Sequence, residues 1–241
     1  MCEVQLDFEN QMFIELLAQD GMVVLARGLG LERLFLKFLK LYSDHHQLVL
    51  VLNTSPAHQG QYMEELLREK VDHLPRSITN EVSVKERETV YQRGGVVFIT
   101  SRILVVDLLR GQCPVAGVSG LLIWSAHKVT ETSSEAFIIR LFRESSKSGF
   151  VKAFSDSPEQ FMSGFCQLER VMRCLFLRHL YLWPRFHATV SSSLATHKPE
   201  VVELRQQLSP AMTAIQMAVL DLIKSCISEL KTSNPAVVGD G

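Results

Sequence analysis

Two glycines in a strand-to-helix turn are the residues of this sequence that could bind a phosphate group. Gly28 and Gly30 follow the apolar run 22–26 and precede residues 31–41, where apolar side chains recur at helical spacing. Backbone N–H groups in such a turn point at an anion, and the positive end of the helix dipole favours its negative charge. Because two glycines here are more often a structural turn than a nucleotide site, the interpretation depends on the elements around them.

Short apolar segments alternate with helical segments over the first two thirds of the chain. The apolar segments are 22–26, 48–52, 96–100, 121–124 and 151–154. Helical periodicity covers 8–19, 31–41, 61–69, 103–109 and 135–144. Strands that are almost continuously apolar are usually covered on both faces. The alternation therefore predicts an α/β fold with a parallel sheet flanked by helices.

The pattern changes after residue 157. Two helical patterns, Phe161–Trp183 and Pro210–Lys231, replace the strands, and Ser209 before Pro210 is a favourable helix start. We predict an α/β domain over residues 1–157, an incomplete all-α unit over 158–232 and a tail over 233–241. An apolar stripe along the second helix is expected to pack against this unit or against a further domain.

Composition narrows the possible classes of protein. Of the 241 residues, 46% are apolar, and 25 basic against 26 acidic side chains give a net charge of -1. Any contact with nucleic acid therefore needs a local basic face. The five cysteines are scattered and never spaced as C-x-x-C, and the histidines lack paired spacing, so we expect no disulfide framework and no metal site. Purely apolar runs are far shorter than the roughly 18 residues of a membrane span, so no membrane partner is expected.

Set against superfamily-two helicases, the glycine turn resembles a phosphate-binding loop that has lost its reactive side chains. Leu31 stands where the lysine belongs, and Glu32 stands where the threonine belongs. The lysine stabilises the β and γ phosphates and the hydroxyl holds magnesium, whereas Glu32 places negative charge beside an anion. Like charges about 4 Å apart cost on the order of 4 kcal/mol at an effective dielectric constant near 20.

A second helicase motif has lost its acids. The Asp-Glu-Ala-His box that holds magnesium and activates water resembles residues 124–127, where alanine and His127 match but Trp124 and Ser125 replace both carboxylates. We therefore predict a degenerate nucleotide site without catalytic residues. Its members are Gly28, Gly30, Leu31, Glu32, Trp124, Ser125 and His127.

Longer segments resemble the XPF family of structure-specific DNA-repair endonucleases. The likeness is carried by residues 26–30, 95–107, 180–187 and 197–203, and by helicase-like landmarks in the expected order at 49–54, 98–101 and 153–158. It covers nearly the whole chain. The resemblance implies a degenerate RecA-like helicase domain that would be the N-terminal part of a longer protein.

The resemblance also implies a function and partners. Longer family members cut 5′ to damage in nucleotide excision repair and crosslink repair, using a nuclease domain with Mg or Mn and a smaller heterodimer subunit. Those regions have no counterpart in this sequence, so no cofactor is expected in the chain itself. The family further implies branched or damaged DNA as a ligand, a large nuclease scaffold protein docked on the helicase-like part, and a nuclear location.

Four arginines near the predicted helix 161–183 have two interpretations. Arg170, Arg173, Arg178 and Arg185 are either a solvated helix face or contacts to the phosphate backbone of DNA, as in the helical insertion of archaeal relatives. A second basic group, Arg140, Arg143, Lys147 and Lys152, is expected to be solvated charge.

Three functions remain open from the sequence. The favoured one is a non-catalytic scaffold that binds DNA and repair partners. An active DNA-dependent ATPase or helicase is the enzyme alternative, for which Gly28, Gly30 and the fold are the support. A module that binds only protein partners is the third.

Overall fold

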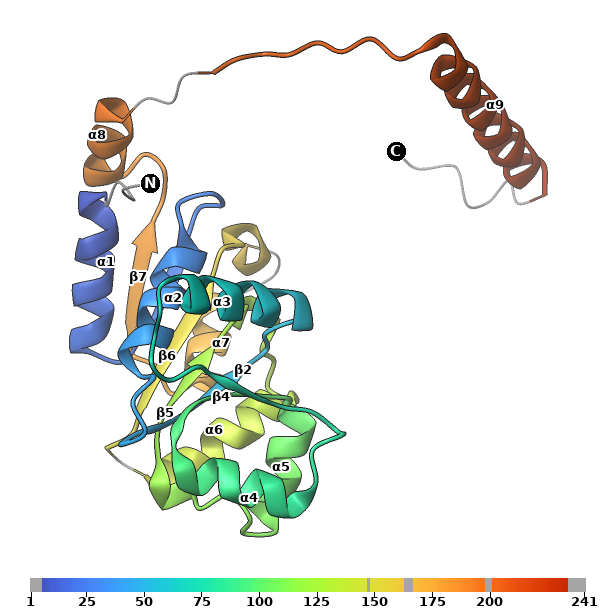
Figure 1. Ribbon diagram of the computed structural model, residues 1–241. Helices are drawn as coiled ribbons and strands as arrows, with labels where there is room; N and C mark the ends of the chain where they lie inside the picture. The colour runs from blue at the N-terminus through green and yellow to red at the C-terminus, as the bar shows by residue number, and fades with distance from the viewer. Residues whose placement is uncertain (1–5, 147, 163–166, 198–200, 234–241) are drawn as a thin grey trace. The chain divides into compact units, whose positions relative to one another are not determined.

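The computed structural model describes residues 6–146, 148–162, 167–197 and 201–233. The chain divides into two compact units, Met1–His197 and Lys198–Gly241, and each is described by itself. The first unit is built on a seven-stranded sheet, and the described part of the second contains a long helix, α9 (Figure 1). Parts of the sequence interpretation fall on Lys147 and on residues 163–166, 198–200 and 234–241, which lie outside the described residues.

All neighbouring strands run parallel, in the order β3-β4-β2-β5-β6-β1-β7. The strands are β1 Gly21–Leu25, β2 Leu48–Leu52, β3 Arg76–Ile78, β4 Gly95–Ile99, β5 Val118–Ile123, β6 Phe150–Ser155 and β7 His179–Trp183. Because β1 lies between β6 and β7, the loop that follows β1 is next to the carboxyl ends of both. The predicted parallel α/β sheet flanked by helices is confirmed.

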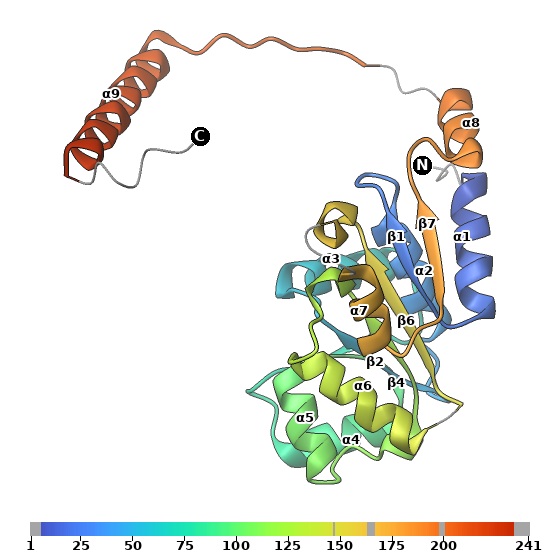
Figure 2. The same ribbon diagram turned by 180° about the vertical axis from the view of Figure 1, so that it is seen from behind.

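Helices cover both faces of the sheet, which explains why the strands are so uniformly apolar. One face packs against α1 Asp7–Ala18, α2 Leu31–Leu41, α3 Pro56–Arg68 and α8 Ala188–Thr196. The other face packs against α4 Val84–Arg93, α5 Ser101–Leu109, α6 Ser134–Ser145 and α7 Gln167–Cys174 (Figure 2). Along β1, Val23 joins the first core and Met22 the second, as the alternation of a strand requires.

Three short 3₁₀ turns flank strands β5 and β6. They are η1 Val115–Gly117, η2 Ala126–Lys128 and η3 Pro158–Phe161. The turns η2 and η3 follow β5 and β6, so both lie on loops at the carboxyl edge of the sheet.

The single helix predicted over Phe161–Trp183 is wrong. Helix α7 ends at Cys174, and residues 179–183 form β7, which pairs with β1 from Gly21↔His179 to Leu25↔Trp183. A continuous apolar run fits either a helix or a buried strand by periodicity alone. Gly21 admits this strand, since a Cβ at Gly21 would lie 2.6 Å from the ring of Tyr181.

The division of the chain also differs from the predicted one. The first compact unit extends to His197, well past the predicted boundary at residue 157, because β7 extends the sheet and α8 packs on its face. The sequence interpretation also missed β3 and α4. Arg87 of α4 reaches the buried Asp107 of α5 through bonds of 2.9 and 3.0 Å, and the Tyr91 hydroxyl donates to the same carboxylate at 2.7 Å.

A Schellman motif ends α7. The Phe176 N–H donates to the Arg173 carbonyl at 3.2 Å, and the Leu177 N–H donates to the Met172 carbonyl at 2.9 Å. The motif places one residue in the left-handed conformation, usually glycine. Here it is Phe176, with φ of 54°. The sequence therefore lacks the glycine that normally marks such a helix end.

The second basic group is not uniformly solvated, which corrects the prediction. Lys152 is only 2% exposed, and its Nζ donates to the carbonyl of Leu16 and, at 3.2 Å, to that of Gln19. Burial lowers the pKa of Lys152. The ammonium thus satisfies carbonyls at the end of α1, which carries no basic residue in its last turn. Arg143 pairs with Asp20 at 2.5 Å.

Helix α9 spans Pro210–Ser233 and matches the predicted helix closely. Its start is capped as expected, because the Met212 N–H donates to the Ser209 hydroxyl at 3.3 Å. No residue of α9 is buried within its own unit. By length and composition it is a candidate membrane span, a test that core helices of soluble proteins also pass.

Candidate functional site

The loop between β1 and α2 has the backbone shape of a phosphate-binding turn. Gly28 and Gly30 have φ of 81° and 79°, the left-handed region that glycine adopts without steric cost. Gly30 is the N-cap of α2, and the Leu34 N–H donates to its carbonyl at 3.0 Å. The predicted strand, glycine turn and helix are therefore confirmed as a local structure.

The side chain that should provide the cation points into the core. Leu31 is 6% exposed and belongs to the apolar cluster beneath α2. Glu32 lies exposed in the first turn of the helix. Burial raises the pKa of Tyr62, and the carboxylates of Glu32 and Asp156 raise it further, so the field at this phenol is negative. This field is unfavourable for a triphosphate.

The end of β5 carries an aromatic cluster in place of the acids. Trp124 is 5% exposed, and its ring centroid lies 4.8 Å from that of Phe35, 6.0 Å from that of Tyr62 and 5.8 Å from that of His58. Phe35 in turn meets Phe154 of β6 at 5.0 Å. The position next to the glycine loop is thus filled by packed rings.

Ser125 and His127 stabilise the turn after β5. Ser125 adopts φ of 50°, and the His127 Nδ1 lies 2.9 Å from the Ser155 hydroxyl of β6. Burial lowers the pKa of His127, Lys128 lowers it further, and Asp156 and Glu159 oppose the shift. A neutral imidazole that links two strand ends is a structural part of the turn.

Two arginines clamp the glycine loop. The Arg27 guanidinium donates to the Glu159 carboxylate at 2.8 Å and to the Ser157 hydroxyl at 3.4 Å. Arg185, which follows β7, donates to the Arg27 carbonyl at 2.6 Å. A Cβ at Gly28 would lie 3.0 Å from the Arg185 Nη2, so this guanidinium rests against the loop. Sequence reasoning missed the role of Arg27, which only the adjacency of β1, β6 and β7 reveals.

The residues present do not fit a magnesium triphosphate. The loop offers backbone N–H groups, but Leu31 and Trp124 supply neither a cation nor a metal ligand. The buried Tyr62 hydroxyl has no hydrogen-bond partner among the described residues, and a neutral phenol cannot replace the lysine. No cluster of three or more His, Cys, Asp or Glu side chains suited to a metal occurs in the described part of the chain.

The four arginines predicted to contact DNA do not share one surface. Arg178 precedes β7 and Arg185 follows it, so they lie at opposite ends of a strand that rises about 3.3 Å per residue. Arg170 lies beside residues 129–132, which follow β5 and η2. Arg173 pairs with Glu169 at 2.6 Å on the exposed side of α7. The structure thus separates Arg170 and Arg185, near the carboxyl edge, from Arg178.

Several known proteins are similar to this chain in sequence. No protein-family model matches the chain. It is 52% identical over 232 residues to the DNA repair endonuclease XPF of Mus musculus, covering 96% of this chain and 25% of that protein. It is 42% identical over 234 residues to the XPF of Drosophila melanogaster, covering 97% and 24%. The chain is homologous to the N-terminal, helicase-like part of XPF.

The fold is similar to that of a helicase domain. The Hef helicase domain of Pyrococcus furiosus matches 78% of this chain and 40% of that chain, with a TM-score of 0.66 and 21% sequence identity. This likeness identifies the helicase-like α/β fold. The chain spans about a quarter of the length of the XPF relatives it matches. The sequence match to the mouse XPF covers 96% of the chain, so it extends over the sheet and over α8 and α9.

Proposed function

We propose that this chain is the non-catalytic, helicase-like scaffold of an XPF-type repair endonuclease subunit. The observation that carries the proposal is the glycine loop, which keeps its turn at Gly28 and Gly30 while Leu31 is buried and Trp124 packs among rings. A loop of this kind retains the fold of a nucleotide site without the groups that bind and cleave a triphosphate. The alternative of an active ATPase has only the backbone of the loop in its favour.

The scaffold would position a longer protein on its substrate. The relatives are named DNA repair endonucleases, which supports DNA cleavage in repair as the activity of that protein. Within that activity we propose incision 5′ to damage in nucleotide excision repair and crosslink repair. The nuclease, with its Mg or Mn, and the contact with a smaller subunit would lie in regions that this chain does not match. A large nuclease scaffold protein would dock on the helicase-like part, and the site of action would be the nucleus.

Binding to branched or damaged DNA is assigned to Arg170 and Arg185. Both are exposed and lie toward the carboxyl edge of the sheet. A net charge of -1 gives no general attraction, so a few local guanidinium groups must supply the phosphate contacts. Arg185 also orders the glycine loop, so DNA binding and the degenerate site share one residue.

Binding of a forked DNA to the full chain at several salt concentrations tests this assignment. We expect salt-dependent binding that weakens in Arg170→Glu and Arg185→Glu, with the slope of log K against log salt smaller by about one unit per lost contact. Arg68→Glu is the matched charge control, because Arg68 lies in the last turn of α3, at the end of that helix remote from the carboxyl edge of the sheet. Absence of binding even at low salt would leave a module that binds only proteins.

A further inference from the structure

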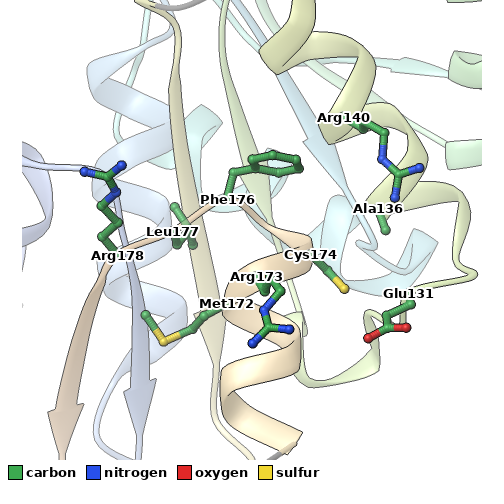
Figure 3. A pocket seen from close by; sticks show the side chains of 9 residues that line it. All are labelled: Glu131, Ala136, Arg140, Met172, Arg173, Cys174, Phe176, Leu177 and Arg178. Carbon is green, nitrogen blue, oxygen red and sulfur yellow. The ribbon is translucent and has the colours of Figure 1, made fainter.

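A concave pocket lies between α6, α7 and the turn that precedes β7, away from the glycine loop. Its volume is about 480 Å³ (Figure 3). Apolar side chains from α7 and the turn form its floor, and charged side chains from all three segments form its rim. We call it the α6–α7 pocket and define it by Arg140, Met172, Arg173, Phe176, Leu177 and Arg178.

The rim of the α6–α7 pocket is positively charged. Three arginines and one glutamate, Glu131, give it a formal charge of two positive units. Neither Arg140 nor Arg178 forms an ion pair with any residue that the structure describes. Arg173 pairs with Glu169, but both side chains are more than half exposed, and such pairs contribute little. The guanidinium groups are therefore available to an incoming anionic group.

The floor of the pocket contains an aromatic ring in an unfavourable backbone position. Phe176 occupies the left-handed residue of the Schellman motif and is nevertheless 51% exposed. A bulky residue rarely adopts this backbone conformation, which is strained. Because the Phe176 ring is half-exposed, its burial does not offset that strain. Figure 3 shows the ring between the Arg140 and Arg178 side chains. The exposed ring thus offers an apolar contact surface flanked by two cations.

We propose that the α6–α7 pocket is a docking site for an acidic peptide segment of a partner protein that carries a large apolar side chain. The apolar side chain would sit against Phe176, Met172 and Leu177, and its flanking carboxylates would accept hydrogen bonds from Arg140 and Arg178. Charge complementarity selects this occupant.

A DNA backbone fits the pocket less well. Phosphate contacts need no apolar floor, whereas the floor of this pocket is formed by Met172, Phe176 and Leu177. A peptide can turn its apolar side chain inward and keep its carboxylates toward the arginines. This inference rests on neither the nucleotide loop nor the DNA contacts proposed above.

Fluorescence anisotropy with the full chain tests the proposal. The probe is a labelled peptide, Glu-Asp-Asp-Leu-Phe-Asp-Glu. One control peptide has Ser-Ser in place of Leu-Phe, and a second has amides in place of the carboxylates. We expect saturable micromolar binding of the probe and clearly weaker binding of both controls. The first control lacks the apolar side chains that would contact the floor of the pocket, and the second lacks the carboxylates that would accept hydrogen bonds from the arginines.

Variants of the chain locate the site. Arg140→Glu and Arg178→Glu should each weaken probe binding about tenfold or more, whereas Arg68→Glu on the opposite face of the sheet should not. Phe176→Gly should weaken binding while raising the melting temperature, which separates loss of the ligand contact from loss of the fold.

Three results would overturn the proposal. They are an absence of saturable binding, equal effects of Arg68→Glu and Arg178→Glu, or binding of forked DNA that is lost in Arg140→Glu and Arg178→Glu while the peptide does not bind. The last result would make the pocket a nucleic-acid surface. A chain that binds forked DNA through Arg170 and Arg185 but not the peptide would keep the function proposed above and lose this site.

Discussion

Leu31 and Trp124 change the chemistry of the glycine loop without changing its shape. Leu31 packs into the core below α2, and Trp124 lies among rings, so both side chains contribute to stability at positions where helicases need charge. The glycines stay necessary for a different reason. The left-handed backbone at Gly28 and Gly30 lets α2 start directly against the sheet, whether or not an anion is bound.

His127 should make stability depend on pH. Burial lowers its pKa in the folded chain below the ordinary value of about 6.5, so the unfolded chain binds the proton more readily. The stabilisation is therefore fully present above about pH 6.5 and decreases as the pH falls through the folded-state pKa. Urea unfolding at pH values on either side of this window should show a larger loss for the native chain than for His127→Gln. Equal losses would mean that His127 titrates as it does in water.

Replacement of Phe176 by glycine should stabilise the folded chain, although it removes a large apolar side chain. Phe176→Gly removes the strain of a left-handed aromatic residue, which is roughly 1–2 kcal/mol, and loses only a half-exposed ring. We expect the free energy of unfolding to rise by about 1 kcal/mol. Phe176→Ala is the control, because it removes the ring but keeps the Cβ and hence the strain. A clear loss of stability in Phe176→Gly would show that the ring is needed for packing.

Strand β7 depends on a single missing side chain in β1. A Cβ at Gly21 would lie 2.6 Å from the Tyr181 ring and 3.1 Å from the His179 carbonyl oxygen, so Gly21→Ala must displace the Tyr181 ring or β7 itself. We expect a loss of about 1–3 kcal/mol in urea unfolding, the usual range for overpacking.

Gly60 provides the matched control for this substitution. It lies inside α3 with open space around its Cβ position. Gly60→Ala should therefore raise stability by about 0.5–1 kcal/mol. A Gly21→Ala chain as stable as Gly60→Ala would mean that β7 does not pack against β1 as described.

Elements could be predicted from the sequence where the local residue pattern agrees with the packing in the folded chain. Apolar runs such as 48–52 are buried on both faces, and the cap at Ser209 uses neighbouring residues only, so both were predictable. The helix end at Phe176 carries no glycine, and no glycine or proline separates α7 from β7, so neither was predictable. At the candidate site, the loss of the cation and acids follows from residue types. The clamp by Arg27 and Arg185 requires knowing that β7 lies beside β1.

At the scale of the whole molecule, the nearly neutral charge means that an anionic ligand would be attracted by local groups of arginines and not by the molecule as a whole. A net charge of -1 leaves recognition to a few exposed arginines of the first unit. Arg170 and Arg185 lie toward the carboxyl edge of the sheet, and Arg140 and Arg178 flank the α6–α7 pocket. Arg170 nevertheless lies close to the α6–α7 pocket, because Glu131 and Cys174 line both surfaces.

Isothermal titration of Mg²⁺ and ATP into the full chain tests the central claim most directly. The buried Leu31, the exposed Glu32 and the ring cluster at Trp124 predict no saturable heat and no release of phosphate, with or without forked DNA. Saturable micromolar binding that requires Mg²⁺, accompanied by turnover, would contradict the account of this chain as a non-catalytic scaffold.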